Sequence, residues 1–544
     1  MPVINFSYED LIDLLGYGLD RDRFLEEFPM IGCDVERVEG DEIGIEIFPD
    51  RPDMNSVEGI ARAVRSFFEI EPGLKEYRVR ESDVTTYVDK SVENIRPFIA
   101  TALIKGVDVN DRVISSIMDL QEKLHHGIGR NRKKMAIGVH DFDKVSQPFT
   151  YKAVDPSSTR FVPLGFTEEM SLEEILKRHP KGVEYGHLLK DKERYPLLID
   201  SNNNVLSFPP IINGRLTEVN TSTRNIFIDV TGEDENVVRL ALNIISTALA
   251  ERGGEIHLTK VIYGNEVKIY PELSPVERRL KKEYAERIIG VRLAQEDVKR
   301  SLLRMGYDVR IEGDEIIVRI PAWRGDILHD IDVVEDIAIG YGFNRIEPDK
   351  PKCLTYGRSL KKSRMIKKMR TILIGLGFCE VATLTLSNKR DELERMGSEG
   401  KVIEIENPIS GELSCVRASL LPSLMKICRA NRHRSLPQRI FEVGYVVNEE
   451  AKNELHLSFL EIDEGTNFSR CKSLFEAISR DAGMELEMKR YEHPAFIKGR
   501  CAGIYYRGEL IGYFGELHPK TLVEFDLEHP GIALEMNLDQ IEGC

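Results

Sequence analysis

Four carboxylates lie close together in the second half of the chain, in a segment with helical spacing. Asp332, Glu335 and Asp336 are three and four residues apart, so they share one face if the segment is helical. Asp326 lies just upstream, after an apolar strand, and can fold over that face. Oxygen ligands without histidine or cysteine favour a hard cation, Mg²⁺ before Zn²⁺. The alternative is an acidic helix face balanced by Arg324 or by a lysine of a partner.

A second polar group lies in the middle of the chain. Asp229 and Thr231 are two residues apart at the end of an apolar strand, so their side chains are expected on the same side of it. Ser207 begins a proline-rich apolar loop, residues 208–213. Together these groups could hydrogen-bond a small ligand and a water molecule. The alternative is that Asp229 and Thr231 cap the turn that follows the strand.

His140 and Asp141 end another apolar stretch and offer an acid and a base, although a single histidine beside an aspartate is more often structural. The chain has no P-loop, GxGxxG, HExxH or nucleophile-elbow pattern. No cysteine–histidine spacing supports a thiol nucleophile. A hydrolytic reaction in this chain would therefore use a positioned water molecule.

The segment with the four carboxylates is the second copy of a passage near the N-terminus. Residues 39–53 read EGDEIGIEIFPDRPD and residues 312–326 read EGDEIIVRIPAWRGD, an offset of 273 residues (39 to 312). Each copy predicts a turn, an apolar strand, Arg-x-Asp and a helix. Matching residues 57–61 with residues 334–338 needs an offset of 277, and so four extra residues before the second helix. The repeat predicts shared architecture with an acidic site in only one copy.

Length and composition limit the class of protein. A chain of 544 residues is too long for one core, so about three to five domains are expected. Hydrophobic residues at 42% and charged residues at 31% are typical of a soluble globular protein. No apolar run of about 18 residues predicts a membrane span, and the acidic start is unlike a signal peptide. Eight scattered cysteines without a Cys-x-x-Cys pair favour a reducing cytoplasm.

The net charge of −16 argues against a general nucleic-acid coat. Three basic clusters still leave local RNA contacts open, at residues 130–134, 361–370 and 429–434. The alternative for each cluster is a solvated charged face.

Hydrophobic periodicity and turn residues predict the elements that position these groups. Helices are expected over residues 56–68, 113–126, 237–251 and 361–375, and two more between 281 and 305, divided near Gly290. Strands are expected over residues 100–107, 135–140, 226–230, 382–386, 440–447 and 531–538, with a hairpin at 505–513.

With these elements in place, several passages resemble one known family. Residues 320–342 (IPAWRGDILHDIDVVEDIAIGYG) closely resemble the B5 module of phenylalanyl-tRNA synthetase β subunits. Residues 130–143 and 207–231 look like the B3/B4 editing region of the archaeal and eukaryotic-cytosolic type. Residues 406–422 and 440–444 look like the class II synthetase-like core of that subunit. The resemblance covers nearly the whole chain.

The resemblance implies a multidomain chain of the α+β and α/β classes, with duplicated helix-plus-hairpin modules. The expected domains are a B1-like module (1–75), a B3/B4-like editing domain (84–265), a B5-like module with an acidic metal site (268–348), and an antiparallel class II-like core (352–544, B6/B7-like). Residues 531–539 of that core lack the arginine that holds ATP in active class II enzymes, so we expect it to be catalytically silent.

The resemblance also implies a function. The family forms an α2β2 heterotetramer that joins phenylalanine to tRNA(Phe) with ATP, which is bound mainly by the α subunit. The β subunit supplies scaffold, interface and a hydrolytic site that clears Tyr-tRNA(Phe). The family's Mg²⁺ ligands, shared with α, correspond to Asp326, Asp332, Glu335 and Asp336. A cytoplasmic protein without membrane association is expected.

For editing, the resemblance and the polar pattern together favour Asp229, with Ser207 and Thr231, for substrate recognition and water placement. An alternative is a non-catalytic scaffold or tRNA-binding subunit whose editing site has decayed. A free-standing metal-dependent hydrolase is disfavoured, because the carboxylates lie on a different module from the pocket residues. The chain also lacks length for the oligonucleotide-fold insertion and the anticodon-binding domain of bacterial β subunits, so anticodon contacts like theirs are not expected from it.

Overall fold

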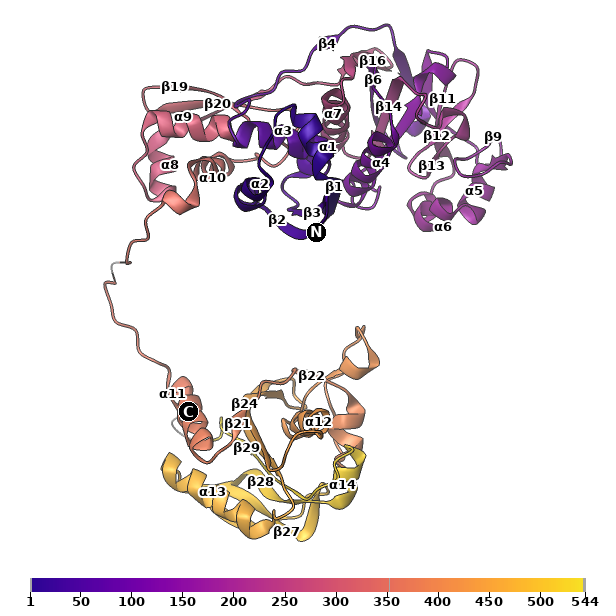
Figure 1. Cartoon of the computed structure of the whole chain (residues 1–544). Helices are drawn as coiled ribbons and strands as arrows, with labels where there is room; N and C mark the ends of the chain where they lie inside the picture. The colour runs from indigo at the N-terminus through magenta and orange to yellow at the C-terminus, as the bar shows by residue number, and fades with distance from the viewer. Residues whose placement is uncertain (1, 352, 542–544) are drawn as a thin grey trace. The chain divides into compact units, whose positions relative to one another are not determined.

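The computed structural model describes residues 2–351 and 353–541, and the chain divides into two compact units, residues 1–349 and 350–544 (Figure 1). Each unit is described separately below. Among the described residues, no helix combines the length and the apolar composition needed to cross a membrane. The seven described cysteines are all free thiols, and Cys544 lies outside the described residues.

The repeated passage folds into two copies of one small module. The first copy contains β1 (Val3–Ser7), α1 (Tyr8–Leu15), α2 (Arg21–Glu27), β2 (Cys33–Glu39), β3 (Glu42–Ile47) and α3 (Val57–Phe67). The second contains β18 (Val276–Lys281), α8 (Lys282–Ile289), α9 (Gln295–Arg304), β19 (Asp308–Glu312), β20 (Glu315–Ile320) and α10 (Asp330–Tyr341). Their sheets have the same order, β1-β3-β2 and β18-β20-β19. Buried side chains of both copies form one common hydrophobic core.

The expected four-residue insertion before the second helix is wrong. Helix α3 begins at Val57 and α10 at Asp330, so the offset of 273 continues through both helix starts. The residues before them, Ser56 and His329, are the two N-caps. A shift of four residues is close to one helical turn of 3.6 residues and keeps each side chain on nearly the same face. Matching apolar faces therefore made the shifted alignment look better than the true one.

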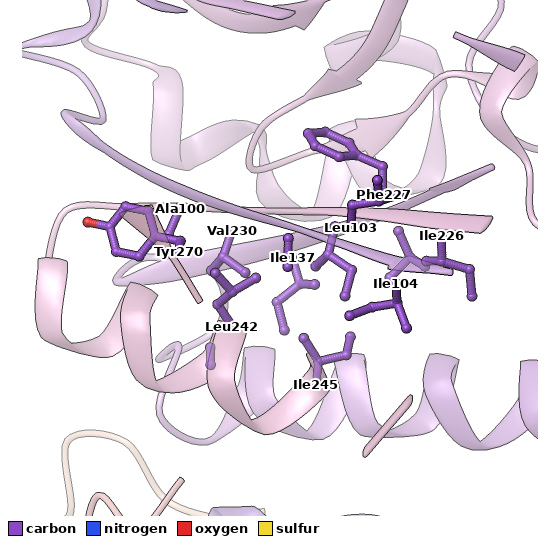
Figure 2. Packing of buried hydrophobic residues seen from close by; sticks show 14 of the residues in the cluster. Ala100, Leu103, Ile104, Ile137, Ile226, Phe227, Val230, Leu242, Ile245 and Tyr270 are labelled. Atoms are coloured by element: carbon purple, nitrogen blue, oxygen red, sulfur yellow. The ribbon is translucent and has the colours of Figure 1, made fainter. Parts of the chain in front are cut away.

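The middle of the first unit is built on a five-stranded sheet covered by helices on one face. Its order is β4 (Val79–Arg80), β15 (Glu255–His257), β6 (Phe98–Lys105), β14 (Asn225–Gly232), β7 (Met135–Asp141). Helices α4 (Asp111–His126) and α7 (Glu235–Glu251) confirm the two helices expected there. Figure 2 shows Ile137 and Val230 between this sheet and Leu242 of α7, whereas Phe227 points away from the helix.

A second sheet lies on the other face, where Phe227 stacks on Phe149 with ring centroids 4.4 Å apart. Its seven strands run in the order β13 (Ile212–Asn213), β12 (Val205–Phe208), β11 (Tyr195–Ile199), β8 (Phe149–Val154), β5 (Thr85–Val88), β16 (Thr259–Tyr263), β17 (Glu266–Tyr270). Strands β9 (Arg160–Phe161) and β10 (Met170–Ser171) and helices α5 (Leu172–Arg178) and α6 (Pro180–Tyr185) lie between β8 and β11 in the chain. Asp229 and Thr231 have the strand parity of Phe227, so they face this second sheet.

The second unit is a seven-stranded sheet with helices on both faces. The order is β21 (Cys379–Glu380), β24 (Gln438–Val447), β25 (Asn453–Ile462), β29 (Gly531–Asn537), β28 (Glu509–Leu517), β27 (Phe496–Tyr506), β26 (Glu487–Arg490). Helices α11 (Lys361–Gly375) and α13 (Phe468–Ala482) contribute to one core, and α12 (Leu421–Ala430) and α14 (Pro519–Glu524) to the other. The pairs are antiparallel except β21–β24.

One predicted strand of this unit, residues 382–386, is largely wrong. Only Leu386 and Ser387 form a short strand (β22), which pairs with β23 (Cys415–Val416). The backbone at 381–385 makes isolated hydrogen bonds and no ladder: the N–H of Val381 donates to the carbonyl of Phe441, and the carbonyl of Thr385 accepts from the N–H of Arg417. Apolar and β-branched composition predicted a strand, but within the described ranges no partner strand continues the ladder beyond Leu386.

Candidate functional site

A cavity of about 350 Å³ lies at the β7 edge of the five-stranded sheet, beside the proline-rich loop. Asp229 and Thr231 of β14 line it together with Ser207 of β12. All three side chains are at most 2% exposed. The sequence expectation that Asp229 and Thr231 lie on one side of their strand is confirmed, and the fold brings Ser207 to the same cavity.

The carboxylate of Asp229 is held through one of its two oxygens. Oδ2 lies 2.7 Å from Nε2 of His140 and accepts a 3.4 Å hydrogen bond from the Ser207 hydroxyl. No described residue hydrogen-bonds Oδ1 of Asp229, which leaves this oxygen for a ligand. Gly138 lies directly opposite on β7, and a Cβ there would lie 2.1 Å from Oδ2. Because Gly138 has no side chain, the Asp229 carboxylate can keep this position and stay open to a ligand in the cavity.

His140 is a site residue that sequence reasoning placed with the wrong partner. Its ring is fully buried, and Nδ1 lies 2.8 Å from the hydroxyl of Thr217 while Nε2 meets Asp229. Asp141 points elsewhere, accepts a hydrogen bond from Thr223, and caps the turn at Asp143. The acid–base pair considered for His140 and Asp141 is therefore replaced by a cross-strand pair. Adjacency in sequence could not reveal it, because neighbouring side chains on a strand point to opposite faces.

The apolar wall of the cavity is the loop from Phe208 to Ile211. Arg132 holds this loop, since its Nη1 donates to the carbonyls of Pro210 (3.2 Å) and Ile211 (2.8 Å). Its guanidinium also lies over the ring of Tyr185, 4.4 Å from the centroid. Arg132 is only 6% exposed, so this member of the basic cluster at 130–134 is not part of a solvated face. The cavity thus combines an apolar wall with hydroxyls and the buried carboxylate of Asp229, and can bind an apolar group that carries a hydrogen-bond donor.

A second cavity, of about 580 Å³, lies between the two copies of the small module, and we call it the acidic groove. It is lined by all four carboxylates singled out from the sequence and by Asp50 of the first copy. The expected helix is present as α10, so Asp332, Glu335 and Asp336 share a face. The structure thus places the four carboxylates along one groove.

Arg324 engages two of the carboxylates that line the acidic groove. Its Nη2 lies 2.6 Å from Asp326 and 2.7 Å from Asp336, and Tyr307 donates a further hydrogen bond to Asp336. Burial alone would lower the pKa of Arg324, but Asp336, Tyr307 and Asp326 raise it well above the ordinary value. The balancing of the acidic face by Arg324, considered from the sequence, is therefore present for two of the four carboxylates.

The other two carboxylates differ from each other. Asp332 accepts hydrogen bonds from the backbone N–H groups of Leu328 (2.8 Å) and His329 (2.6 Å), which caps α10. Glu335 makes no hydrogen bond or ion pair with any described residue, and burial together with neighbouring carboxylates raises its pKa. In the described part of the chain, no three carboxylate, imidazole or thiol groups are arranged so that they could hold a metal ion. The donor chemistry suits a hard cation, but Asp326 and Asp336 share their charge with Arg324.

Three family models match the chain. Residues 86–262 match the B3/4 domain, residues 278–343 match the tRNA synthetase B5 domain, and residues 346–538 match the CLM domain of the phenylalanyl-tRNA synthetase beta chain. The B3/4 match covers the cavity with Asp229, and the B5 match covers α10.

Curated relatives match over the full length. The phenylalanine–tRNA ligase beta subunit of Methanosarcina acetivorans is 44% identical over 547 residues, covering 100% of this chain and 99% of that protein. The Archaeoglobus fulgidus beta subunit is 43% identical over 542 residues, covering 99% and 98%. Among solved structures, an N-terminal fragment of the phenylalanyl-tRNA synthetase beta subunit from Pyrococcus horikoshii is 41% identical with a TM-score of 0.61, covering 63% of this chain and 100% of the fragment.

Proposed function

The chain belongs to the family of phenylalanine–tRNA ligase β subunits, and from that premise we propose that its B3/4 domain hydrolyses tyrosine wrongly attached to tRNA(Phe). As a β subunit it acts with an α subunit and a tRNA in the ligase that charges tRNA(Phe) with phenylalanine. We also propose that the ligase is an α2β2 tetramer and that it acts in the cytoplasm.

The observation that carries the editing proposal is the buried Asp229 with a free carboxylate oxygen. Tyrosine differs from phenylalanine by one hydroxyl, and an apolar synthetic pocket rejects an added hydroxyl only about 10²-fold. A second pocket whose carboxylate accepts a hydrogen bond from that hydroxyl sorts in the opposite sense. Phenylalanine in this pocket would leave Oδ1 of Asp229 desolvated and without a hydrogen-bond partner, which is costly.

The reaction is the hydrolysis of an ester. The oxygen of a water molecule attacks the carbonyl carbon, the carbonyl oxygen becomes an oxyanion, and the bond to the ribose oxygen then breaks. The water supplies one proton, which ends on the ribose oxygen, and the products are tyrosine and free tRNA. In this proposal Asp229 binds the phenol, while Ser207 and Thr231 place the water and the ester.

Alanine at Gly138 tests the geometry without removing a functional group. Its Cβ would lie 2.1 Å from Oδ2 of Asp229 and 2.6 Å from Nε2 of His140, so the carboxylate has to move. We expect clearance of Tyr-tRNA(Phe) to fall about 10²-fold, comparable with losing the contact itself. Gly18→Ala is the matched control, because a Cβ there meets nothing within 4 Å. Unchanged deacylation by Gly138→Ala would contradict the placement of the site.

We also propose that the acidic groove is where this chain contributes to Mg²⁺ binding. Glu335 and Asp332 are the accessible ligands, and Asp326 and Asp336 complete the set once their side chains turn from Arg324 toward the cation. A bound cation would supply a counter-charge for the crowded carboxylates and stabilise the contact with the α subunit.

Magnesium is expected to raise the melting temperature of the chain, because a ligand that binds the folded state stabilises it. Replacing Glu335 with glutamine should abolish this rise, since it removes a ligand that no other described residue engages. Asp330→Asn is the matched control on the same helix, because Asp330 pairs with Arg278 at 2.9 Å and does not line the acidic groove. An equal response of the wild type and Glu335→Gln in calorimetry would exclude Glu335 as a ligand.

For the second unit we propose a class II-like core that is catalytically silent, as part of a four-domain division at about the limits given from the sequence. Glu535 of its closing strand supports this, since it is occupied by protein donors: Ser419 (2.6 Å), the backbone N–H groups of Leu420 and Leu421, and His456 (2.9 Å). Strand β29 contains no arginine that could hold ATP.

The ligase with both subunits offers a direct test of the proposed function. Given tyrosine, ATP and tRNA(Phe), an editing enzyme should form AMP continuously while little Tyr-tRNA(Phe) accumulates. Accumulation of Tyr-tRNA(Phe) without excess AMP would favour the alternative, a scaffold subunit whose editing site has decayed.

A further inference from the structure

Arg96 comes just before β6 in the chain. Its side chain reaches the end of the neighbouring strand β14 and contacts Thr231, which lines the cavity. Its Nε donates to the Thr231 hydroxyl (3.0 Å) and its Nη2 to the Thr231 carbonyl (2.8 Å). Nη1 donates to the carbonyl of Lys133, just before β7 (3.1 Å). One guanidinium thus ties Thr231 to the segment that enters the neighbouring strand.

The Arg96 side chain is buried without a counter-ion. It is 3% exposed, and within the described ranges no carboxylate lies within ion-pair distance of it. Burial lowers the pKa of Arg96 to about 10, so it remains charged at neutral pH. An unpaired buried charge is costly, and structural arginines are usually paired. Neutral donors could satisfy two carbonyls at lower cost, so the charge calls for another explanation.

The direction of the hydrogen bond to Thr231 explains why a charged donor is present. A guanidinium has donors only, so the Thr231 oxygen must accept from Arg96, and its own proton points elsewhere. None of the described residues accepts that proton. Because Thr231 lines the cavity, the proton is presented to whatever the cavity holds. A hydroxyl that accepts from a cation is also a stronger donor, since hydrogen bonds in a chain polarise one another.

The resulting donor complements Asp229. The two residues are two positions apart on β14, about 7 Å along the strand, and face the same cavity. Asp229 offers an acceptor and Thr231 a donor. With the tyrosine hydroxyl at Asp229, the ester carbonyl is the acceptor that remains at the other end of the aminoacyl group.

We propose that Arg96 is a positioning residue of the editing reaction: it orients the Thr231 hydroxyl as a donor toward the ester carbonyl oxygen, where negative charge develops during hydrolysis. This inference rests on the proposed editing function. Arg96 itself touches no substrate and acts through Thr231.

A double-mutant cycle on the ligase with both subunits tests this role, with single-turnover deacylation of Tyr-tRNA(Phe) as the readout. Thr231→Val removes the hydroxyl at nearly constant shape, and Arg96→Lys keeps the charge but loses the two-point contact. Each should lower the rate constant at saturating enzyme by about 10²-fold, the usual loss for one such donor. The half-saturating concentration should change little. In the Thr231→Val background, Arg96→Lys should have no further effect. Thr231→Ser, which keeps the hydroxyl, should retain most of the rate.

The possible results separate the role of Arg96 from the editing function itself. Additive losses in the cycle, or losses confined to the half-saturating concentration, would overturn the inference and leave the editing function intact. Failure of the wild-type enzyme to deacylate Tyr-tRNA(Phe) would overturn both. If Arg96→Lys does not fold, as shown by its melting curve, Arg96→Gln takes its place. If neither folds, Thr231→Val decides alone, because an unchanged rate constant would contradict a donor at Thr231.

Discussion

Replacing Asp229 with alanine is expected to lower kcat/KM for the deacylation of Tyr-tRNA(Phe) by at least about 100-fold, because the tyrosine hydroxyl loses its buried acceptor. Slow deacylation of Phe-tRNA(Phe) should not fall, since phenylalanine never used that contact. The selectivity of the enzyme, measured as the ratio of the two rates, should therefore collapse toward unity.

The matched control is Asp143→Asn. Asp143 lies in the turn that follows β7, and its carboxylate bonds the side-chain amide of Asn225 at 2.9 Å, away from the cavity. It should edit like the wild type. Equal loss of both deacylation activities in Asp229→Ala, with an unchanged melting curve, would mean that Asp229 acts on the ester and does not recognise the phenol.

The second large effect is on stability. Replacing Asp336 with asparagine breaks a buried ion pair, because the Arg324 and Asp336 side chains are only 2% and 7% exposed. Breaking a buried ion pair from one side is strongly destabilising. Because Asp326 still faces Arg324 at 2.6 Å, we expect a loss at the low end of the usual range, about 3 kcal/mol in the free energy of unfolding of the first unit. Urea denaturation of the full chain, followed by the fluorescence of Trp323 in that unit, measures it.

A surface pair of similar geometry provides the control. Glu69 accepts two bonds from Arg300, at 2.7 and 2.6 Å, but these side chains are 37% and 62% exposed. Glu69→Gln should cost about 0 to 1 kcal/mol, because water screens the pair. Similar losses for the two variants would show that burial of the Arg324 pair contributes nothing.

Much of this fold is visible in the sequence because local signals and tertiary structure agree. The basic helix expected over residues 361–375 is found with those limits, and the hairpin at 505–513 turns at Arg507 and Gly508, both with positive φ. The repeat likewise predicted two modules. It could not predict that both close over one core, since that depends on how the copies pack.

The site was only partly predictable. Asp229 and Thr231 follow from the period of two residues along a strand, and Ser207 from its place beside the proline-rich loop. His140, Gly138 and Arg96 become site residues only through strand register, which pairs Gly138 with Asp229 and brings Arg96 to Thr231. Single-sequence patterns carry no information on which strands pair. The acidic groove shows the converse, because spacing identified its carboxylates but not the engagement of two of them by Arg324.

The most direct test of the central claim compares the deacylation of Tyr-tRNA(Phe) and Phe-tRNA(Phe), charged beforehand, by the wild-type ligase with both subunits and without ATP. If the buried carboxylate sorts by the hydroxyl, tyrosine is released faster than phenylalanine by about 100-fold or more. Release of both at the uncatalysed rate, by an enzyme that still charges phenylalanine, would contradict an editing site in this chain.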